Sequence, residues 1–375
     1  MPSAAIAASV TDWLSSWPTA SAEASLRRSA LTSGAGMAAD PVADIKAMFD
    51  ILETGLAWHC LCAVTRLDVP DRLAGGPLPV PQLAAAVNAH EDSMRRVLSL
   101  LSDHGIVTLD NDQAGLTSRG RLLCRDHPLS QHATFATVSM QDVAHELTQT
   151  LRTGQAATLT ALGAPYWEYL AAHPDQEELF GEQMRQQAQI SSLPCVPLVD
   201  WPAAATVADI AGGIGTVLAA VLRAAPHARG ILVDEPPVLE RAGRFLGSQG
   251  VAHRCTLQPG DLFAPPPAAD IYLLARVLHD WDDDHAAQIL TALGAAESSR
   301  LRIFERLLPD DDRPDRAKGS DVAMLLLFGG GRERTAGEYR ELLDRAGWQM
   351  GQIVTNPGGM SVIEASRPAT SSAAP

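Results

Sequence analysis

The sequence feature that most constrains the fold is the stretch of residues 206–234, TVADIAGGIGTVLAAVLRAAPHARGILVD. It predicts a buried strand over residues 207–210, a glycine-rich turn, an apolar helix over residues 216–224 and a second strand that ends at Asp234. Glycines let backbone N–H groups approach a ligand, and a carboxylate at the end of the second strand can accept both hydroxyls of a ribose. Gly213 precedes Asp234 by about 20 residues, the spacing expected for this pairing. The stretch predicts a βαβ unit with a nucleoside-binding crevice, although a structural turn explains the glycines alone equally well.

Composition limits the class of protein. With 375 residues and 46% hydrophobic content, the chain can bury a sizeable core, and we expect two domains. Its formal charge of −15 repels phosphate backbones, which argues against nucleic acid as a partner. The five cysteines lack the spacing of metal sites and suit reduced thiols in a cytoplasm. The longest uncharged apolar run, residues 210–222, is too short to span a bilayer, and we see no signal peptide. We expect a cytoplasmic protein that does not contact the membrane.

The N-terminal third predicts a small helical domain behind a tail. Residues 1–40 are rich in Ala and Ser and are predicted to be disordered, as are residues 369–375. Residues 41–137 predict a long helix, a Gly/Pro break, two shorter helices and a β-wing, the pattern of a winged-helix domain. Such domains bind DNA or mediate dimerisation. Arg95 and Arg96 alone do not make the basic footprint that DNA requires, so we interpret residues 41–137 as a dimerisation domain.

Residues 138–200 are predicted to be helical again and to end in a proline-rich hinge. Aromatic and methionine side chains adapt well to flat apolar ligands, so we consider four residues as candidate walls of a substrate pocket. These are Trp167, Phe180, Met184 and, further along the chain, Met324. Ordinary core packing explains the same pattern.

The α/β alternation continues over residues 201–368 and predicts a doubly wound α/β domain. Its third strand ends at Asp261, Leu262 and Phe263. Asp261 could bond the exocyclic amine of an adenine while Leu262 and Phe263 pack against the ring, although a turn aspartate is an equal explanation. Residues 352–355 and 360–364 predict a hairpin at the sheet edge.

The fourth strand, residues 271–274, leads into an acidic segment that contains His279. We interpret Asp280 and the acids at 282–284 as the solvated first turn of the next helix, and we predict no metal, because hard cations require carboxylates from several elements. His279 is different, since it lies beyond the carboxyl end of a central strand, where doubly wound sheets bind their ligands. We therefore predict that His279 is a general base.

From residue 42 to residue 365 the chain resembles the small-molecule O-methyltransferases of bacteria and plants, of the caffeate or hydroxyneurospore type, that use S-adenosylmethionine. The resemblance is carried, in the family's order, by the motifs DIAGGIG (209–215), VDEPP (233–237), GDLF (260–263), ARVLHDWDDD (275–284), FERLLP (304–309) and FGGGRERT (328–335). The combination of HDWDDD and GGRERT is specific to the family, whereas GDLF alone is weak.

The resemblance implies a role for each matched position. Asp234 holds the ribose, Asp261 and Leu262 frame the adenine, and Gly213 and Gly215 line the turn. Arg276 lies near the methionine moiety, and Glu305 and Glu333 flank the general base His279. The chain departs from the family at Ala211, where glycine is usual, and at Ile214. The alanine methyl group fits if the local φ is negative.

The leading functional hypothesis is therefore methylation of a hydroxyl on an aromatic or polyketide secondary metabolite by a homodimeric enzyme, in a pathway such as antibiotic biosynthesis. A second hypothesis is a diverted enzyme on the same fold, a hydroxylase or a pericyclase. A third is a noncatalytic binding protein, which His279, Glu305 and Glu333 argue against.

Overall fold

The computed structural model describes residues 40–138, 140–295 and 300–367. The two tails that the sequence predicts to be disordered therefore lie outside the described residues, apart from Asp40. The chain divides into two compact units, residues 1–59 and 60–375. The boundary falls inside one long helix, α3 (Pro41–Arg66).

The first unit is described only by the N-terminal part of α3. That part exposes a series of large apolar side chains: Val42, Ile45, Met48, Phe49, Ile51, Leu52 and Leu56. Among the described helices, α3 is the one that is long and apolar enough to cross a membrane by length and composition. Apolar side chains left exposed at this density also suit a protein–protein interface.

The predicted helices and β-wing are present after α3. The helices are α4 (Val69–Leu73), α5 (Val80–Ala86), α6 (Glu91–Asp103) and α7 (Ser118–Arg121), and the strands are β1 (Leu78–Pro79), β2 (Val107–Asp110) and β3 (Gln113–Leu116). The strands form a sheet in the order β1-β3-β2. Asn111 and Asp112 both have positive φ, as a two-residue hairpin that matches the twist of its strands requires. Leu83, Leu98 and Leu101 are fully buried in the core below.

A helical segment follows. Its helices are α8 (His132–Ala136), α9 (Met140–Val143), α10 (Leu147–Thr153), α11 (Ala157–Ala161), α12 (Tyr166–Ala172) and α13 (Pro174–Ile190), with 3-10 turns η1 (Ala144–Glu146) and η2 (Leu193–Leu198). Prolines interrupt η2, and the hinge at this point stays a prediction.

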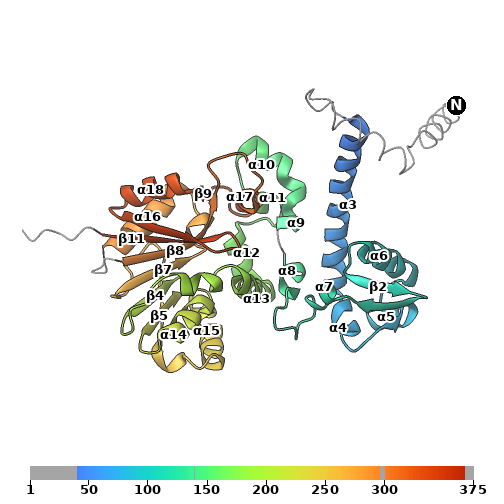
Figure 1. Cartoon of the computed structure of the whole chain (residues 1–375), viewed down its shortest axis with the longest axis horizontal. Helices are drawn as coiled ribbons and strands as arrows, with labels where there is room; N and C mark the ends of the chain where they lie inside the picture. Colours follow the sequence, from blue (N-terminus) through green and yellow to red (C-terminus); the bar gives the residue numbers. More distant parts are fainter. Residues whose placement is uncertain (1–39, 139, 296–299, 368–375) are drawn as a thin grey trace, which may run out of the picture. The chain divides into compact units, whose positions relative to one another are not determined.

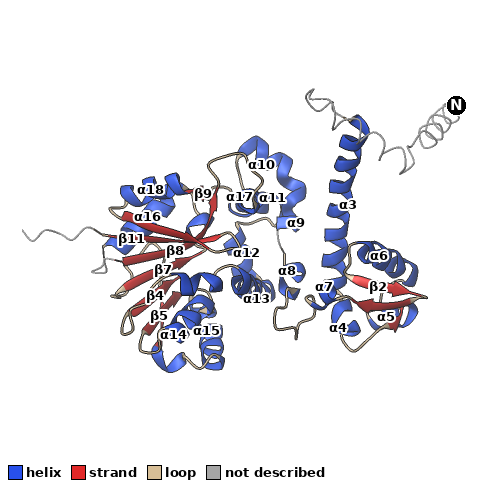
Figure 2. Ribbon diagram, in the orientation of Figure 1, coloured by secondary structure: helices blue, strands red, loops and turns tan. Residues whose placement is uncertain are grey.

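The C-terminal part is the predicted doubly wound α/β domain (Figures 1 and 2). Its strands are β4 (Thr206–Ile210), β5 (Arg229–Asp234), β6 (Cys255–Pro259), β7 (Ile271–Ala275), β8 (Arg300–Leu308), β9 (Arg334–Thr335), β10 (Gln349–Thr355) and β11 (Met360–Ser366). Its helices are α14 (Thr216–Ala224), α15 (Pro236–Ser248), α16 (Asp283–Gly294), α17 (Arg316–Phe328) and α18 (Ala336–Arg345), with turns η3 (Ala252–Arg254) and η4 (Leu278–Asp280).

The sheet order is β10-β11-β8-β7-β4-β5-β6, and β9 pairs with β8. The strands from β6 to β8 are parallel, whereas β11 pairs antiparallel with β8 and β10 forms the predicted edge hairpin with β11. Helices α14 and α15 pack on one face and α16 and α18 on the other (Figure 1). The carboxyl ends of the five parallel strands therefore meet along one edge, which is where a ligand is expected.

Candidate active site

At one position in the turn between β4 and α14, the backbone faces open space. A Cβ added at Gly212 would meet the Asp209 carboxylate at 2.5 Å, and one at Gly215 would meet Leu246 at 3.1 Å, so packing accounts for these glycines. A Cβ at Gly213 would meet nothing within 4 Å. Gly213, with φ of 59°, is therefore the part of the turn that a ligand can approach.

Ala211 does not have the negative φ at which an alanine methyl group fits easily. Its φ is +51°, in the left-handed region, whereas the alanine methyl group was expected to fit with a negative φ. The N–H of Ala211 donates to the carbonyl of Val233 at 2.8 Å, and this bond holds the residue in place. A left-handed conformation costs a residue with a Cβ about 1–2 kcal/mol.

Asp234 links the turn to the next helix. Its Oδ2 accepts the Gly213 N–H and its Oδ1 accepts the Glu235 N–H, both at 2.8 Å. Burial raises the pKa of Asp234 to about 6, against the two backbone hydrogen bonds that lower it. Each carboxylate oxygen retains acceptor capacity, which is what a ribose diol requires.

The segment after β6 brings an aromatic pair together. Phe263 packs edge-on against Trp281, with ring centroids 5.0 Å apart. Asp261 accepts the Phe263 N–H at 2.9 Å and is itself exposed, so it forms the turn and still presents a carboxylate. Leu262 packs partly buried against the core. Sequence reasoning missed Trp281, and the signal available was an aromatic residue two positions after the candidate base.

His279 lies in the turn η4 directly after β7, and its side chain is buried among three carboxyl groups. Nδ1 is 3.1 Å from Glu333 Oε1 and 3.5 Å from Glu305 Oε2. Nε2 is 3.4 Å from Asp280 Oδ1. The structure thus brings together the three predicted catalytic residues, with Asp280 added on the opposite edge of the ring.

The prediction for Asp280 was wrong. It was interpreted as a solvated acid of the helix start, but α16 begins at Asp283, and the Asp280 carboxylate is directed at His279 instead. Asp282 caps the helix, since its Oδ1 accepts the N–H groups of Asp284 and His285. Proximity in sequence hid this difference, because a run of acids does not show which of them turns inward.

The backbone around His279 is fixed from two sides. Glu305 Oε1 accepts the N–H groups of Val277 and Leu278, each at 3.0 Å, and so holds the turn that carries the histidine. Arg334 is fully buried and donates to the carbonyls of Leu278 and Trp281 at 2.9 and 2.8 Å. Because Arg334 follows Glu333 directly, these bonds also set Glu333 opposite the ring.

The charges of the cluster determine its protonation. Burial opposes a charge on His279, but Glu305, Asp280 and Glu333 outweigh it and raise the pKa of His279 to about 9. Burial raises the pKa of Asp280 to about 7, against the attraction of His279. Burial likewise raises the pKa of Glu305. The pKa of Glu333 is lowered despite burial, by its hydrogen bond to His279, the imidazolium charge and the Ser320 hydroxyl, which donates to Glu333 Oε1 at 2.5 Å.

Arg276 follows β7 in a left-handed conformation, with φ of 59°. Its N–H donates to the Phe304 carbonyl at 2.9 Å, and its guanidinium donates to Gln187 Oε1 of α13 at 2.6 Å. Strained residues of this kind persist only where surrounding bonds hold them. The site therefore carries a fixed cation between the sheet and α13.

Two of the four predicted pocket residues come together in an aromatic cluster. Trp167 stacks on Phe328, with centroids 5.3 Å apart at an angle of 24°, and packs edge-on against Phe180 at 5.5 Å. Phe328 was not singled out from the sequence, although it directly precedes the GGG run. Met184 lies on α13 and Met324 is buried on α17, and neither is a ring partner of this cluster.

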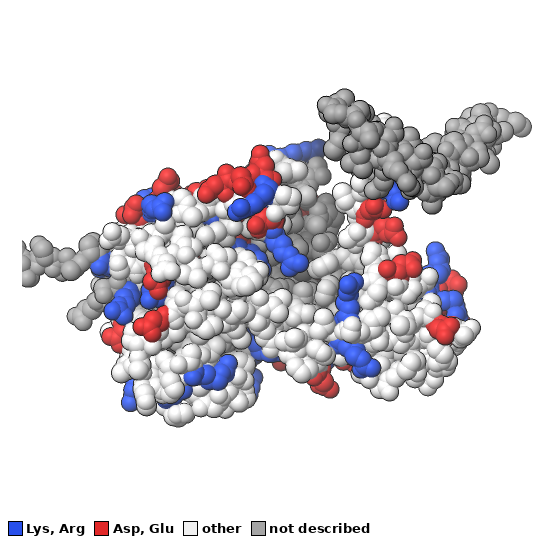
Figure 3. All heavy atoms as spheres, in the orientation of Figure 1, with Lys and Arg blue, Asp and Glu red and all other residues white. Residues whose placement is uncertain are grey.

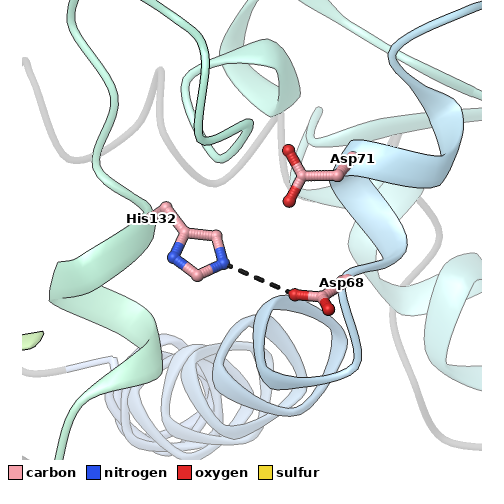
Figure 4. A group of neighbouring side chains, drawn as sticks. All are labelled: Asp68, Asp71 and His132. Carbon is pink, nitrogen blue, oxygen red and sulfur yellow. Dashed lines mark ion pairs between the residues drawn. The ribbon is translucent and has the colours of Figure 1, made fainter. Parts of the chain in front are cut away.

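Two groups of described residues place potential metal ligands within 4.8 Å of one another. The first is His279 with Glu305 and Glu333. The second is Asp68, Asp71 and His132, drawn in Figure 4, where His132 Nε2 lies 3.8 Å from Asp68 Oδ1. Arg125 already pairs with both carboxylates of the second group, at 2.6 and 3.0 Å. The absence of a metal stays a prediction.

Charge on the surface bears on other partners. On the face shown in Figure 3, Lys and Arg side chains are scattered among acidic ones. The expectation that neither nucleic acid nor membrane is a partner stays a prediction.

Comparison with known proteins gives two family matches. The profile of the O-methyltransferase domain matches residues 144–349, and that of the O-methyltransferase dimerisation domain matches residues 49–125. A mitomycin biosynthesis 6-O-methyltransferase of Streptomyces lavendulae is 34% identical over 85% of this chain and 93% of its own. The structure of the mitomycin 7-O-methyltransferase MmcR superposes with a TM-score of 0.81, at 32% identity, over 88% of this chain and 99% of its own.

Two further relatives bear on cofactor and reaction. An O-methyltransferase from neocarzinostatin biosynthesis, solved with S-adenosylmethionine and 2-hydroxy-5-methyl naphthoic acid, has a TM-score of 0.73 and 30% identity, over 84% of this chain and 96% of its own. The aclacinomycin 10-hydroxylase RdmB of Streptomyces purpurascens is 32% identical over 80% of this chain and 84% of its own.

Proposed function

Because the chain belongs to the O-methyltransferase family, whose members use S-adenosylmethionine to modify natural products, we propose that it methylates a hydroxyl group of an aromatic secondary metabolite. The observation that carries this proposal is the buried contact of 3.1 Å between His279 Nδ1 and Glu333 Oε1, at the carboxyl end of β7. An imidazole oriented in this way is the proton acceptor that a phenol, with a pKa of about 10, requires near neutral pH.

The residues at the strand ends fit S-adenosylmethionine. Gly213 faces open space, Asp234 presents a carboxylate with acceptor capacity, and Phe263 and Trp281 offer aromatic surface. In this proposal Asp234 binds the ribose hydroxyls, and Asp261, Leu262 and Phe263 bind the adenine. Arg276 lies beside the methionine end, and Ala211 and Gly215 shape the turn. The sulfonium of S-adenosylmethionine supplies an activated methyl group.

The proposed role of His279 follows from which of its nitrogens is available. Nδ1 faces Glu333 and Glu305, so Nε2 is the atom that receives the proton of the substrate hydroxyl. Glu333 stabilises the imidazolium that results, and Glu305 holds the turn in place without touching the substrate. With a pKa of about 9, the imidazole must first lose a proton at neutral pH, and Asp280 beside Nε2 contributes to that cost.

The aromatic cluster of Trp167, Phe180 and Phe328 is the proposed wall for the substrate ring. Its stacked and edge-on contacts place flat apolar surfaces near α17 and α13. Met184 and Met324 complete the proposed pocket from the same two helices. The relative solved with a naphthoic acid supports an aromatic substrate.

We further propose that the enzyme is a homodimer in the cytoplasm. The chain carries the family's dimerisation domain, and the exposed apolar side chains of α3 would be covered by a second copy. This accounts for the apolar character of α3 without a membrane.

A direct test is incubation of the purified protein with methyl-labelled S-adenosylmethionine and a panel of phenolic polyketides, followed by mass spectrometry. A labelled product that is heavier by one CH₂ supports methyl transfer. The similarity to a hydroxylase favours one competing function, a diverted enzyme. Product formation without consumption of the methyl group would indicate that function instead.

A further inference from the structure

Arg306 lies near the carboxyl end of β8, on the face of the strand opposite to Glu305. Side chains alternate along a strand, so Arg306 shares a face with Phe304, whereas Glu305 points to the turn that carries His279. Phe304 belongs to the core cluster under α14 and α15. Arg306 is partly exposed beyond it, at the edge of the sheet where the ligands of this fold bind.

The guanidinium of Arg306 lacks the partners that other partly buried arginines of this chain possess. Arg241 pairs with Glu177, and Arg254 donates to three backbone carbonyls. Among the described residues, Arg306 donates to one acceptor, the carbonyl of Gly358 at 3.4 Å, and no carboxylate lies within 4.0 Å of it. A five-donor group is thus left largely unused.

The electrostatic surroundings make this cation unusual. Burial and the positive charges of Arg276 and Arg316 lower the pKa of Arg306, although Glu333 and Asp315 act in the other direction. Arg276 and Glu333 are therefore among the charged groups that act on Arg306. An anion placed here would gain from an unpaired cation in a partly desolvated site.

The order of the strands separates Arg306 from the cofactor residues. The glycine turn follows β4, Asp234 ends β5, His279 and Arg276 follow β7, and Arg306 lies two residues before the end of β8. The sheet order β8-β7-β4-β5 therefore places Arg306 on the far side of the base from the proposed cofactor crevice. Adjacent strands are about 4.8 Å apart, so Arg306 is roughly two strand spacings from the glycine turn.

We propose that Arg306 binds a carboxylate carried by the aromatic substrate, so that the enzyme acts on hydroxylated aromatic acids. This inference rests on the proposed function for the identity of the site. The planar fork of a guanidinium matches a carboxylate in two parallel hydrogen bonds. Held in this way at the end of β8, the substrate would have its ring beside the aromatic cluster and its hydroxyl toward His279.

The test compares matched ligands by calorimetry in the presence of S-adenosylhomocysteine. Hydroxybenzoates and hydroxynaphthoates are each paired with the corresponding carboxamide, which keeps the shape and removes the charge. The wild type should bind the acids about 10- to 100-fold more tightly than the amides. Arg306→Gln should abolish the difference, and Arg306→Lys should retain part of it.

Arg316→Gln is the matched control, because Arg316 is an exposed arginine whose charge also acts on Arg306. It should leave the preference for acids intact. The proposal is overturned if wild-type protein binds no acid better than its amide, or if the preference survives Arg306→Gln. It is also overturned if Arg306→Gln weakens S-adenosylhomocysteine binding to the same extent, because the arginine would then serve the cofactor.

Failure of the subsite and failure of the proposed function give different results. Methyl transfer to neutral phenols without any preference for acids would contradict the proposed carboxylate subsite at Arg306 and still support the proposed function. Preferential acid binding that depends on Arg306, without methyl transfer to any member of the panel, would support the subsite and contradict the proposed function.

Discussion

Glu305 lies on β8 and His279 lies in the turn after the neighbouring parallel strand β7, and the Glu305 carboxylate accepts backbone hydrogen bonds from that turn. Glu305 Oε1 binds the N–H groups of Val277 and Leu278 at 3.0 Å, while its Oε2 lies 3.5 Å from the His279 ring. One side chain thus fixes the backbone of the base and contributes to its charge environment.

Replacement of His279 tests the base directly. His279→Ala should lower turnover by about 10²- to 10⁴-fold, the usual contribution of a positioned proton acceptor. The affinity for S-adenosylhomocysteine, measured by calorimetry, should hardly change. His253→Ala is the control, since His253 is exposed in the turn η3, outside the candidate site. Turnover close to that of the wild type in the His279 variant would remove the base from the mechanism.

The pH dependence follows from the sign of the His279 shift. The pKa is raised to about 9, so the imidazole is mostly charged at neutral pH and cannot accept a proton. We expect kcat/KM to rise by about tenfold per pH unit from neutrality until it levels off near that pKa. Asp280→Asn removes one of the charges that raise the pKa and should move the midpoint to lower pH. A profile that is flat over this range, or a midpoint that Asp280→Asn leaves in place, would contradict this account.

Asp234→Ala should weaken cofactor binding. The change removes the proposed ribose acceptor and the hydrogen bond that anchors the Gly213 N–H, so affinity should fall by about 1–3 kcal/mol. Calorimetry with S-adenosylhomocysteine measures this. Glu235→Gln keeps the backbone bond to Asp234 and alters an exposed side chain, so it should behave as wild type. Unchanged binding in the alanine variant would place the cofactor elsewhere.

Ala211→Gly should stabilise the protein. Its φ of 51° is costly for alanine and not for glycine, so the free energy of unfolding should increase by about 1 kcal/mol. Thermal unfolding should shift upward by about 2–4 °C for a domain of this size. Ala220→Gly lies inside the helix α14 and should have the opposite effect, about 1 kcal/mol of destabilisation. Equal destabilisation by both changes would mean that the left-handed conformation carries no strain.

Assembly depends on the exposed face of α3. Leu52 and Leu56 are 59% and 54% exposed and lie one helical turn apart. The double change Leu52→Glu with Leu56→Glu should convert a dimer into a monomer at micromolar concentration, as measured by light scattering. Leu151→Glu is the control, because Leu151 is equally apolar and 73% exposed but lies on α10. A monomeric wild type, or a dimer that survives the double change, would reject this interface.

The sequence predicted those parts of the site that depend on local pattern. The glycine turn, Asp234 and the position of His279 follow from strand, turn and helix signals, and the structure places each at the carboxyl edge of the sheet. The β-wing was predicted from turn residues and is present as β2 and β3. Glu333 was recognised only through its motif, because an acid between two arginines is typical of a solvated surface.

The residues that were missed depend on the direction of a side chain. Asp280 turns inward although its acidic neighbours face solvent, and Arg334 is fully buried although Arg332 beside it is exposed. The positive φ of Ala211, whose N–H bonds to the Val233 carbonyl of the neighbouring strand, is equally invisible in the sequence. These features arise from tertiary packing, which no local periodicity encodes.

Because side chains alternate along β8, two consecutive residues, Glu305 and Arg306, face opposite sides of the strand and can be engineered separately. Glu305 faces the turn of the base and is tied to it by backbone hydrogen bonds, so its replacement would disturb the catalytic geometry. Arg306 faces away and holds no comparable bond. Libraries that randomise position 306 while preserving position 305 should therefore retarget substrate choice without rebuilding the proton-transfer machinery.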